Sequence, residues 1–212
     1  MITPKPTTLL FDFDGTIGDT LEVIRKIAHK WIPGEKLDIL ADHKIQDLRG
    51  KSAIDTVRSL GIPMFKLPLI LGWVQARLYR SMNDISIFPH MEDAIRILNK
   101  THTMGIITSN SRANVELFLK KYNLHETFSF VHSGKSVFGK HLIIKRVLKE
   151  YNFHPEKTLY IGDEVRDIDA AHKAGLRVIS VTWGFNTTKI LRKNNPDFLV
   201  NTPKELLELI QY

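Results

Sequence analysis

The residues of this 212-residue chain best suited to chemistry are two aspartates near its start. Asp12 and Asp14 follow an apolar run in the segment Leu-Leu-Phe-Asp-Phe-Asp-Gly-Thr, and Gly15 comes directly after them. Because alternate residues of a strand share a face, both carboxylates should leave the end of a strand on the same side, where two like charges need a cation or a shared proton. Gly15 permits a tight turn and the close approach of a ligand to backbone N–H groups. A plain polar turn is the alternative interpretation of so short a motif.

A second polar group, Thr-Ser-Asn-Ser at positions 108–111, stands between an apolar run and a helical period. Hydroxyls and free N–H groups at the start of a helix form a site for an anion. Ser109 and Asn110 are therefore candidates for binding a phosphate group. Simple capping of the helix by Asn110 or Ser111 explains the same residues equally well.

Two further charged groups follow later apolar runs. Lys140 begins a helical segment after Gly139, where a cation opposes the helix dipole, and this local cost indicates a charge placed for function. Lys135 is a rival candidate, and a solvated lysine is the plain alternative. In the segment Gly-Asp-Glu-Val-Arg-Asp, Asp163 ends a strand and Asp167 returns to the same side four residues later. Acids that merely favour a helix N-terminus are the alternative here.

The elements that must position these groups alternate along the chain. Apolar, β-rich runs are separated by helical periods, which predicts parallel βαβ units in a doubly wound α/β sheet. The runs are almost continuously apolar, as expected of strands covered on both faces. Pro203, at a first helical turn, begins a closing helix. The predicted strands are Thr8–Phe13, Met104–Thr108, Phe128–His132, Thr158–Ile161, Val178–Thr182 and Phe198–Val200.

One interval, from about Asp19 to Ser86, breaks this alternation. Its apolar residues recur with helical spacing throughout, and we find no convincing strand in it. The sequence therefore predicts a small α-helical domain inserted into the α/β core. We expect the core to comprise residues 1–18 and 87–212, and the inserted domain residues 19–86.

The four polar groups each follow a predicted strand, so the sheet should bring them to one edge. The nine histidines show no metal-ligand spacing, and a cluster of carboxylates alone suits a hard cation, of which Mg²⁺ is the natural one. Carboxylates with Mg²⁺, a lysine, and a cradle of hydroxyl and N–H groups form a site for phosphoryl transfer.

Taken together, Asp-Phe-Asp-Gly-Thr, Thr-Ser-Asn, Lys140 and Gly-Asp-Glu-Val-Arg-Asp resemble the four motifs of the haloacid dehalogenase superfamily of phosphatases. The resemblance covers the whole chain. The helical insert is similar to the type-1 cap of that superfamily, and Trp183-Gly184-Phe185-Asn186 is similar to a loop of phosphoglycolate-phosphatase-like members. The resemblance implies a Rossmann-like core and a phosphatase. Namesake dehalogenases lack an acid at the position of Asp14, which favours phosphatase over dehalogenase.

The same resemblance implies a role for each motif residue. Asp12 would be the nucleophile that forms an aspartyl-phosphate, and Asp14 the general acid and then the base for water. Mg²⁺ would be held by Asp12, the backbone carbonyl of Asp14 and Asp163. Asp167 would assist through water. The residues implied to bind the phosphoryl oxygens are Gly15, Thr16, Ser109, Asn110 and Lys140.

The substrate is expected to be a small phosphate ester, with phosphoglycolate or a sugar phosphate as the first candidates. A phosphosugar mutase of the same superfamily is the alternative enzyme. We place the determinants of substrate choice in the insert, with Arg49 and Lys51, which flank Gly50, as candidates; two solvated surface charges explain them equally well.

Charge and composition limit the other functions that the chain could have. The net charge is +7, and the segment from Thr20 to Met82 holds eleven lysines and arginines against six acids. A solvated basic surface explains this excess first, an anionic small substrate second, and a non-catalytic nucleic-acid-binding module third, since no basic run or aromatic–basic ladder is present. The absence of cysteine excludes disulfides and thiolate zinc sites. With no signal peptide and no membrane span, we expect a cytoplasmic monomer or homodimer that binds neither membranes nor nucleic acid.

Overall fold

A computed structural model describes residues 2, 5–29, 63–134 and 139–211 of the chain. The expected specificity residues Arg49 and Lys51, the Gly50 between them and the rival lysine Lys135 lie outside the described residues. The predicted insert at 19–86 is therefore described in part.

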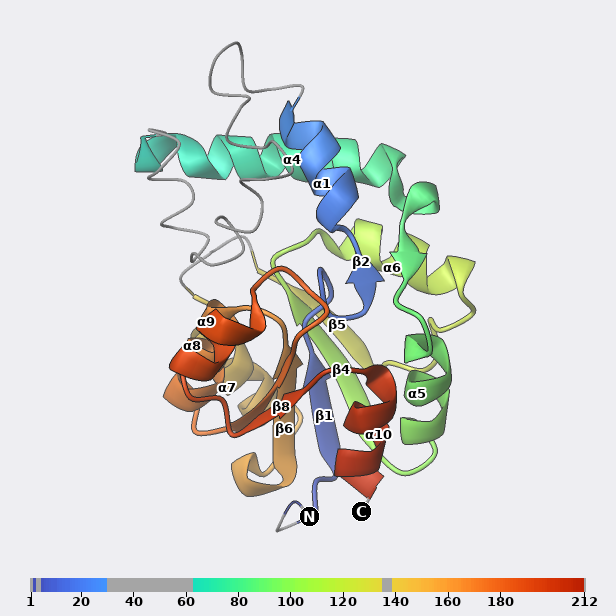
Figure 1. Ribbon diagram of the computed structural model, residues 1–212, viewed down its shortest axis with the longest axis vertical. Helices are drawn as coiled ribbons and strands as arrows, with labels where there is room; N and C mark the ends of the chain where they lie inside the picture. The colour runs from blue at the N-terminus through green and yellow to red at the C-terminus, as the bar shows by residue number, and fades with distance from the viewer. Residues whose placement is uncertain (1, 3–4, 30–62, 135–138, 212) are drawn as a thin grey trace.

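Six parallel strands form one sheet, in the order β5-β4-β1-β6-β7-β8 (Figure 1). All six predicted strands are present, with ends that differ by no more than two residues from the expected ones. β1 lies in the middle of the sheet, with β4 on one side and β6 on the other. This confirms the doubly wound α/β fold. The strands are β1 (Thr8–Phe11), β4 (Thr103–Thr108), β5 (Phe130–Ser133), β6 (Thr158–Gly162), β7 (Arg177–Val181) and β8 (Phe198–Val200).

Helices cover both faces of the sheet, and the side chains of β1 alternate between the two layers. Leu9 and Phe11 pack with α5, α6 and α10, whereas Leu10 packs with α7, α8 and α9. Burial of a strand on both faces accounts for its continuous apolar sequence. The helices are α5 (Met91–Leu98), α6 (Arg112–Lys121), α7 (Lys140–Glu150), α8 (Val165–Lys173), α9 (Thr188–Lys193) and α10 (Pro203–Gln211), with a 3₁₀ turn, η4 (Pro155–Lys157), before β6.

The described helices of the insertion, α1 and α4, lie beyond the end of β1 (Figure 1). They confirm the helical character predicted for the insertion, which is consistent with a cap. The sequence did not predict β2 and β3, two-residue strands that pair antiparallel where the insertion leaves and rejoins the core. The elements are β2 (Gly18–Asp19), α1 (Leu21–His29), η2 (Met64–Lys66), α4 (Leu67–Arg80), η3 (Met82–Asp84) and β3 (Ser86–Ile87). Among the described helices, none is both long and apolar enough to cross a membrane.

Candidate active site

The turn after β1 places the first motif at the carboxyl edge of the sheet. β1 ends at Phe11, two residues earlier than predicted, and the chain then folds back so that the N–H of Gly15 donates to the carbonyl of Gly18 over 2.9 Å. Gly15 has a φ of +75°, a conformation that side chains other than glycine rarely adopt. A Cβ at this position would also collide with the carboxylate of Asp163. The glycine therefore allows the turn to lie directly against the fourth motif.

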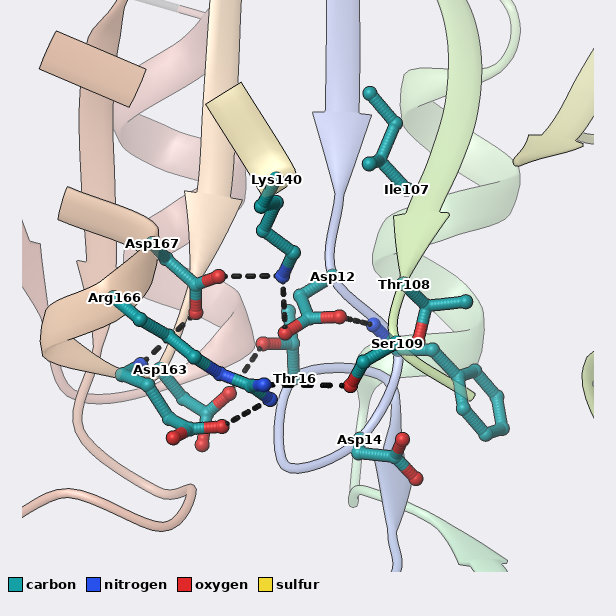
Figure 2. Close-up of polar contacts among 12 residues, drawn as sticks. Asp12, Asp14, Thr16, Ile107, Thr108, Ser109, Lys140, Asp163, Arg166 and Asp167 are labelled. Carbon is teal, nitrogen blue, oxygen red and sulfur yellow. Dashed lines mark hydrogen bonds and ion pairs between the residues drawn. The ribbon is translucent and has the colours of Figure 1, made fainter. Parts of the chain in front are cut away.

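Lys140 stands between two of the predicted acids (Figure 2). Its Nζ lies 2.7 Å from Oδ2 of Asp12 and 2.6 Å from Oδ1 of Asp167, and all three side chains are buried. Burial alone would lower the pKa of Lys140, but Asp12 and Asp167 raise it well above its usual value. The lysine is thus a permanent cation held by two carboxylates. This explains why a positive charge is placed at the start of α7, against the helix dipole.

The acids of the first and fourth motifs form one buried cluster. One carboxylate oxygen from each of Asp12, Asp163 and Asp167 can be chosen so that all three lie within 4.8 Å of one another. Burial and the neighbouring acids raise the pKa of Asp163 well above its usual value. Burial likewise raises the pKa of Asp167 to about 6, against the opposing effect of Lys140. Since three carboxylates converge near a single lysine, this cluster has the charge and the oxygen ligands of a divalent-cation site.

Asp163 is fixed by two hydrogen bonds. The hydroxyl of Thr16 donates to its Oδ1 over 3.0 Å, and the N–H of Phe185 donates to its Oδ2 over 2.6 Å. A Cβ on Gly184 would collide with the same carboxylate, so this loop also approaches it through backbone alone. In addition, the indole of Trp183 donates to the carbonyl of Thr16 over 3.1 Å. The loop recognised in the sequence at 183–186 therefore closes one side of the acidic cluster.

Asp14 faces away from the acidic cluster and has a different environment (Figure 2). Its Oδ1 accepts a hydrogen bond of 3.0 Å from the side-chain amide of Asn110. Burial, followed by the charge of Asp12, raises the pKa of Asp14 to about 7, although Asn110 partly opposes the shift. A carboxyl group with a pKa near neutrality can both donate and accept a proton, as general acid–base catalysis requires.

Arg166, in the first turn of α8, is a site residue that the sequence analysis did not single out. Its guanidinium pairs with Glu164 at 2.5 Å and donates to Oγ of Ser109 over 3.4 Å, so that it links the second and fourth motifs (Figure 2). Its Nε is buried and donates to none of the described residues. Arg166 is the one basic residue in the acidic segment from Gly162 to Asp169, a signal that could have revealed it.

The predicted phosphate-binding residues divide into two groups. Ser109 and Lys140 lie beside Arg166 and Asp12, respectively. Thr16 and Gly15 lie in the turn, where their donors are already in use: the hydroxyl of Thr16 bonds to Asp163, and both backbone N–H groups bond within the turn. The structure thus places Thr16 as a support for Asp163. Asn110 likewise directs its amide to Asp14.

Residues 9–181 match the family of haloacid dehalogenase-like hydrolases. The chain belongs to this family. It is 32% identical to phosphoglycolate phosphatase from Synechococcus elongatus over 203 residues, which are 95% of this chain and 96% of that protein. It is 23% identical to pyrophosphatase PpaX from Oceanobacillus iheyensis over 207 residues, which are 96% of each protein. The protein is therefore a phosphatase of this hydrolase family.

Solved structures of haloacid dehalogenase-like proteins share the fold. A predicted phosphatase from Clostridium acetobutylicum superposes with a TM-score of 0.77 at 21% identity, covering 97% of this chain and 98% of that one. A haloacid dehalogenase-like family protein from Streptococcus pneumoniae gives a TM-score of 0.76 at 20% identity, covering 97% and 99%. These two structures therefore share the overall fold of this hydrolase.

Proposed function

We propose that the enzyme hydrolyses a small phosphomonoester, with phosphoglycolate as the first candidate, through an aspartyl-phosphate on Asp12. The observation that carries this proposal is the contrast between the two aspartates of the first motif. Asp12 is paired with Lys140 in the acidic cluster, as a nucleophile poised beside a cation would be. Asp14 lies outside that cluster, and burial raises its pKa to about 7, which suits a residue that donates a proton near neutral pH. The 32% identity to phosphoglycolate phosphatase supports the choice of substrate.

The acidic cluster fits Mg²⁺, because every available ligand is an oxygen and the carboxylates exceed the nearby positive charge. Asp12, Asp163 and the backbone carbonyl of Asp14 would hold the ion. Asp167 would assist through water, as the family resemblance implies, while its carboxylate accepts hydrogen bonds from Lys140 and from the N–H of Glu164. When bound, the ion would neutralise the negative charge shared by the nucleophile and the phosphoryl group.

In the proposed first step, a carboxylate oxygen of Asp12 forms a bond to phosphorus as the ester P–O bond breaks. Asp14 gives its proton to the departing oxygen. In the second step, water attacks the aspartyl-phosphate, Asp14 accepts the proton of that water, and phosphate leaves as Asp12 is restored. Lys140 and the hydroxyl of Ser109 would bind the phosphoryl oxygens throughout.

Substrate choice is assigned to the insertion. We propose domain boundaries at residues 18/19 and 86/87, which the pairing of β2 with β3 supports because these strands span both junctions. Arg49 and Lys51 stay predicted specificity residues. If Arg49 recognises a substrate carboxylate, Arg49→Ala will raise KM for carboxylated phosphate esters more than for neutral ones.

Release of inorganic phosphate from a panel of phosphate esters, with Mg²⁺ and no other activator, tests the proposed function. The panel should include phosphoglycolate, sugar phosphates and pyrophosphate, with Asp12→Asn as the inactive control. Turnover of a monoester by the native enzyme alone supports the proposal. Turnover of a sugar phosphate that needs a bisphosphate activator and yields its isomer would show the mutase alternative, and turnover of pyrophosphate alone would exclude a monoesterase.

A further inference from the structure

Asn114, in the first turn of α6, belongs to none of the four motifs yet lies in direct contact with one of them. Its side chain is fully buried. The Nδ2 group donates to Oδ1 of Asn110 over 2.8 Å and to the backbone carbonyl of Gln75, on helix α4, over 3.1 Å. Both protons of this amide are therefore used, one toward the active site and one toward the insertion.

Main-chain groups fix the direction of these hydrogen bonds. The carbonyl of Gln75 can only accept, so the group of Asn114 that faces it must be the NH₂. The N–H of Ser111 can only donate, and it bonds to Oδ1 of Asn110 over 2.8 Å, so that atom must be the oxygen. With both of its lone pairs engaged, Asn110 presents its NH₂ group to Asp14. Rotating either side-chain amide by half a turn, so that its oxygen and its NH₂ group exchange places, would bring two acceptors or two donors together.

The side chain of Asn114 leaves one buried polar atom without a hydrogen bond from the described residues. This atom is its side-chain oxygen. Unsatisfied buried acceptors are disfavoured, and an apolar side chain in this place would have avoided one. An asparagine nevertheless supplies two N–H donors here, one for Asn110 and one for the carbonyl of Gln75, which an apolar side chain could not.

We propose that Asn114 is a positioning residue for Asp14, acting through Asn110. By holding the oxygen of Asn110, it keeps the amide N–H on Oδ1 of Asp14 and so orients the carboxyl group that would exchange its proton with the leaving group and with water. Without it, Ser111 alone would restrain the amide of Asn110. The inference rests on the proposed function, because it assigns the proton transfer to Asp14.

The sharpest test replaces Asn114 with Asp, which keeps the shape but turns a donor into an acceptor. An alkyl phosphate, whose leaving group needs a proton, should lose on the order of 10²-fold in kcat, with KM changed less than threefold. Phosphorylation of Asp12 by an aryl phosphate with an acidic leaving group, measured as the burst, should lose less than about fivefold. Gln75→Ala is the matched control. It removes the contact of Gln75 with Ser109 but leaves the backbone carbonyl, so any loss should be equal for both substrates.

Coupling between the two residues separates positioning from a general structural defect. If Asn114 acts through Asp14, then Asn114→Asp should slow the alkyl phosphate no further in an Asp14→Asn background. Losses that multiply in the double variant, or equal losses for alkyl and aryl substrates in the single variant, would overturn the proposal. If Asn114→Asp does not fold, Asn114→Ala is measured in the same way.

A readout independent of turnover keeps this inference distinct from the proposed function. In the ¹⁵N-labelled enzyme, the side-chain amide protons of Asn110 should exchange slowly with water, and in Asn114→Ala at least tenfold faster. Unchanged exchange would refute the inference even in an active phosphatase. Faster exchange in a protein that hydrolyses no phosphate ester would show that Asn114 holds the amide of Asn110, but it would refute the proposed function and with it the role in proton transfer.

Discussion

Lys140 Nζ and Asp12 Oδ2 lie 2.7 Å apart in a buried ion pair. The pair joins two motifs that are separated by more than a hundred residues in the sequence. A paired buried charge is tolerated, whereas a buried charge whose partner is removed is strongly destabilising. The same lysine also pairs with Asp167. Lys140 is therefore both the counter-ion of the nucleophile and the link that holds the acidic cluster together.

Lys140→Met should abolish most activity and destabilise the protein. We expect a loss of at least about 100-fold in kcat, because the phosphoryl group would lose a preorganised cation. In chelator at pH 8, the free energy of unfolding should fall by about 3–5 kcal/mol, the usual cost of orphaning a buried charge. The measurements are phosphate release and urea denaturation. Lys149→Met, on the exposed side of the same helix, is the control and should change neither. Normal activity of Lys140→Met would remove the lysine from the catalytic site.

Asp14→Asn should divide the reaction into its two steps. An alkyl phosphate should be turned over on the order of 10²–10⁴-fold more slowly, because its leaving group receives no proton. An aryl phosphate should still phosphorylate Asp12, but the intermediate would lack a base for its hydrolysis. Rapid-quench kinetics should therefore show a burst of aryl alcohol, and mass spectrometry one added phosphoryl group on the peptide that contains Asp12. Asp12→Asn is the control and should show neither. Wild-type turnover of alkyl phosphates by Asp14→Asn would exclude Asp14 as the acid.

Much of the fold could be predicted from the sequence, because strands that are buried on both faces of the sheet have continuous apolar sequences. Each strand of the parallel sheet is an apolar run, and the rule that sites form at the carboxyl ends of strands was enough to bring Asp12, Lys140 and Asp163 together. The pairing of β2 with β3 could not be predicted, since strands of two residues are too short to show a periodic pattern of apolar residues. The end of β1 was also misplaced, because the turn around Gly15 begins within the apolar run.

The direction of individual side chains could not be predicted in the same way. Arg166 looks like a solvated residue at the start of a helix, but its guanidinium donates to Ser109, which lies 57 positions earlier in the chain. Thr16 was expected to bind phosphate but donates to Asp163, because the turn brings its hydroxyl to the fourth motif. Asn114 is three residues into a helix, where its sequence context indicates only a polar N-terminal turn. Each of these orientations is decided by a partner distant in sequence.

Arg166 should contribute to the binding of the phosphoryl group, because its guanidinium lies 3.4 Å from the hydroxyl of Ser109, an expected phosphate ligand. Arg166→Gln should raise the inhibition constant of inorganic phosphate by about tenfold, equivalent to roughly 1.4 kcal/mol. Glu164→Gln is the matched control. It removes the same ion pair but keeps the guanidinium, so phosphate should bind at least as tightly as in the wild type. If both variants weaken phosphate binding equally, the ion pair has a structural function only.

Metal binding should decide how stability depends on pH. Folding raises the pKa of Asp14 to about 7 and that of Asp167 to about 6, through burial above all, from an ordinary value of 3.8. The folded protein therefore holds these protons more tightly than the unfolded chain does. Without metal, the resulting stabilisation is complete below about pH 4 and is lost as the pH rises through 6 and 7. A divalent cation in the acidic cluster compensates for the negative charge that appears over this range.

In chelator, the melting temperature should accordingly fall between pH 5.5 and pH 8, by roughly 5–10 °C if the loss is about 3 kcal/mol. Excess Mg²⁺ should raise it more at pH 8 than at pH 5.5, as measured by differential scanning calorimetry. Asp163→Asn is the informative variant. The hydroxyl of Thr16 can accept as well as donate, so an amide fits there, and the variant should melt above the wild type in chelator at pH 8 yet gain little from Mg²⁺. A gain from Mg²⁺ that does not depend on pH, or that survives Asp163→Asn, would place the ion outside the acidic cluster.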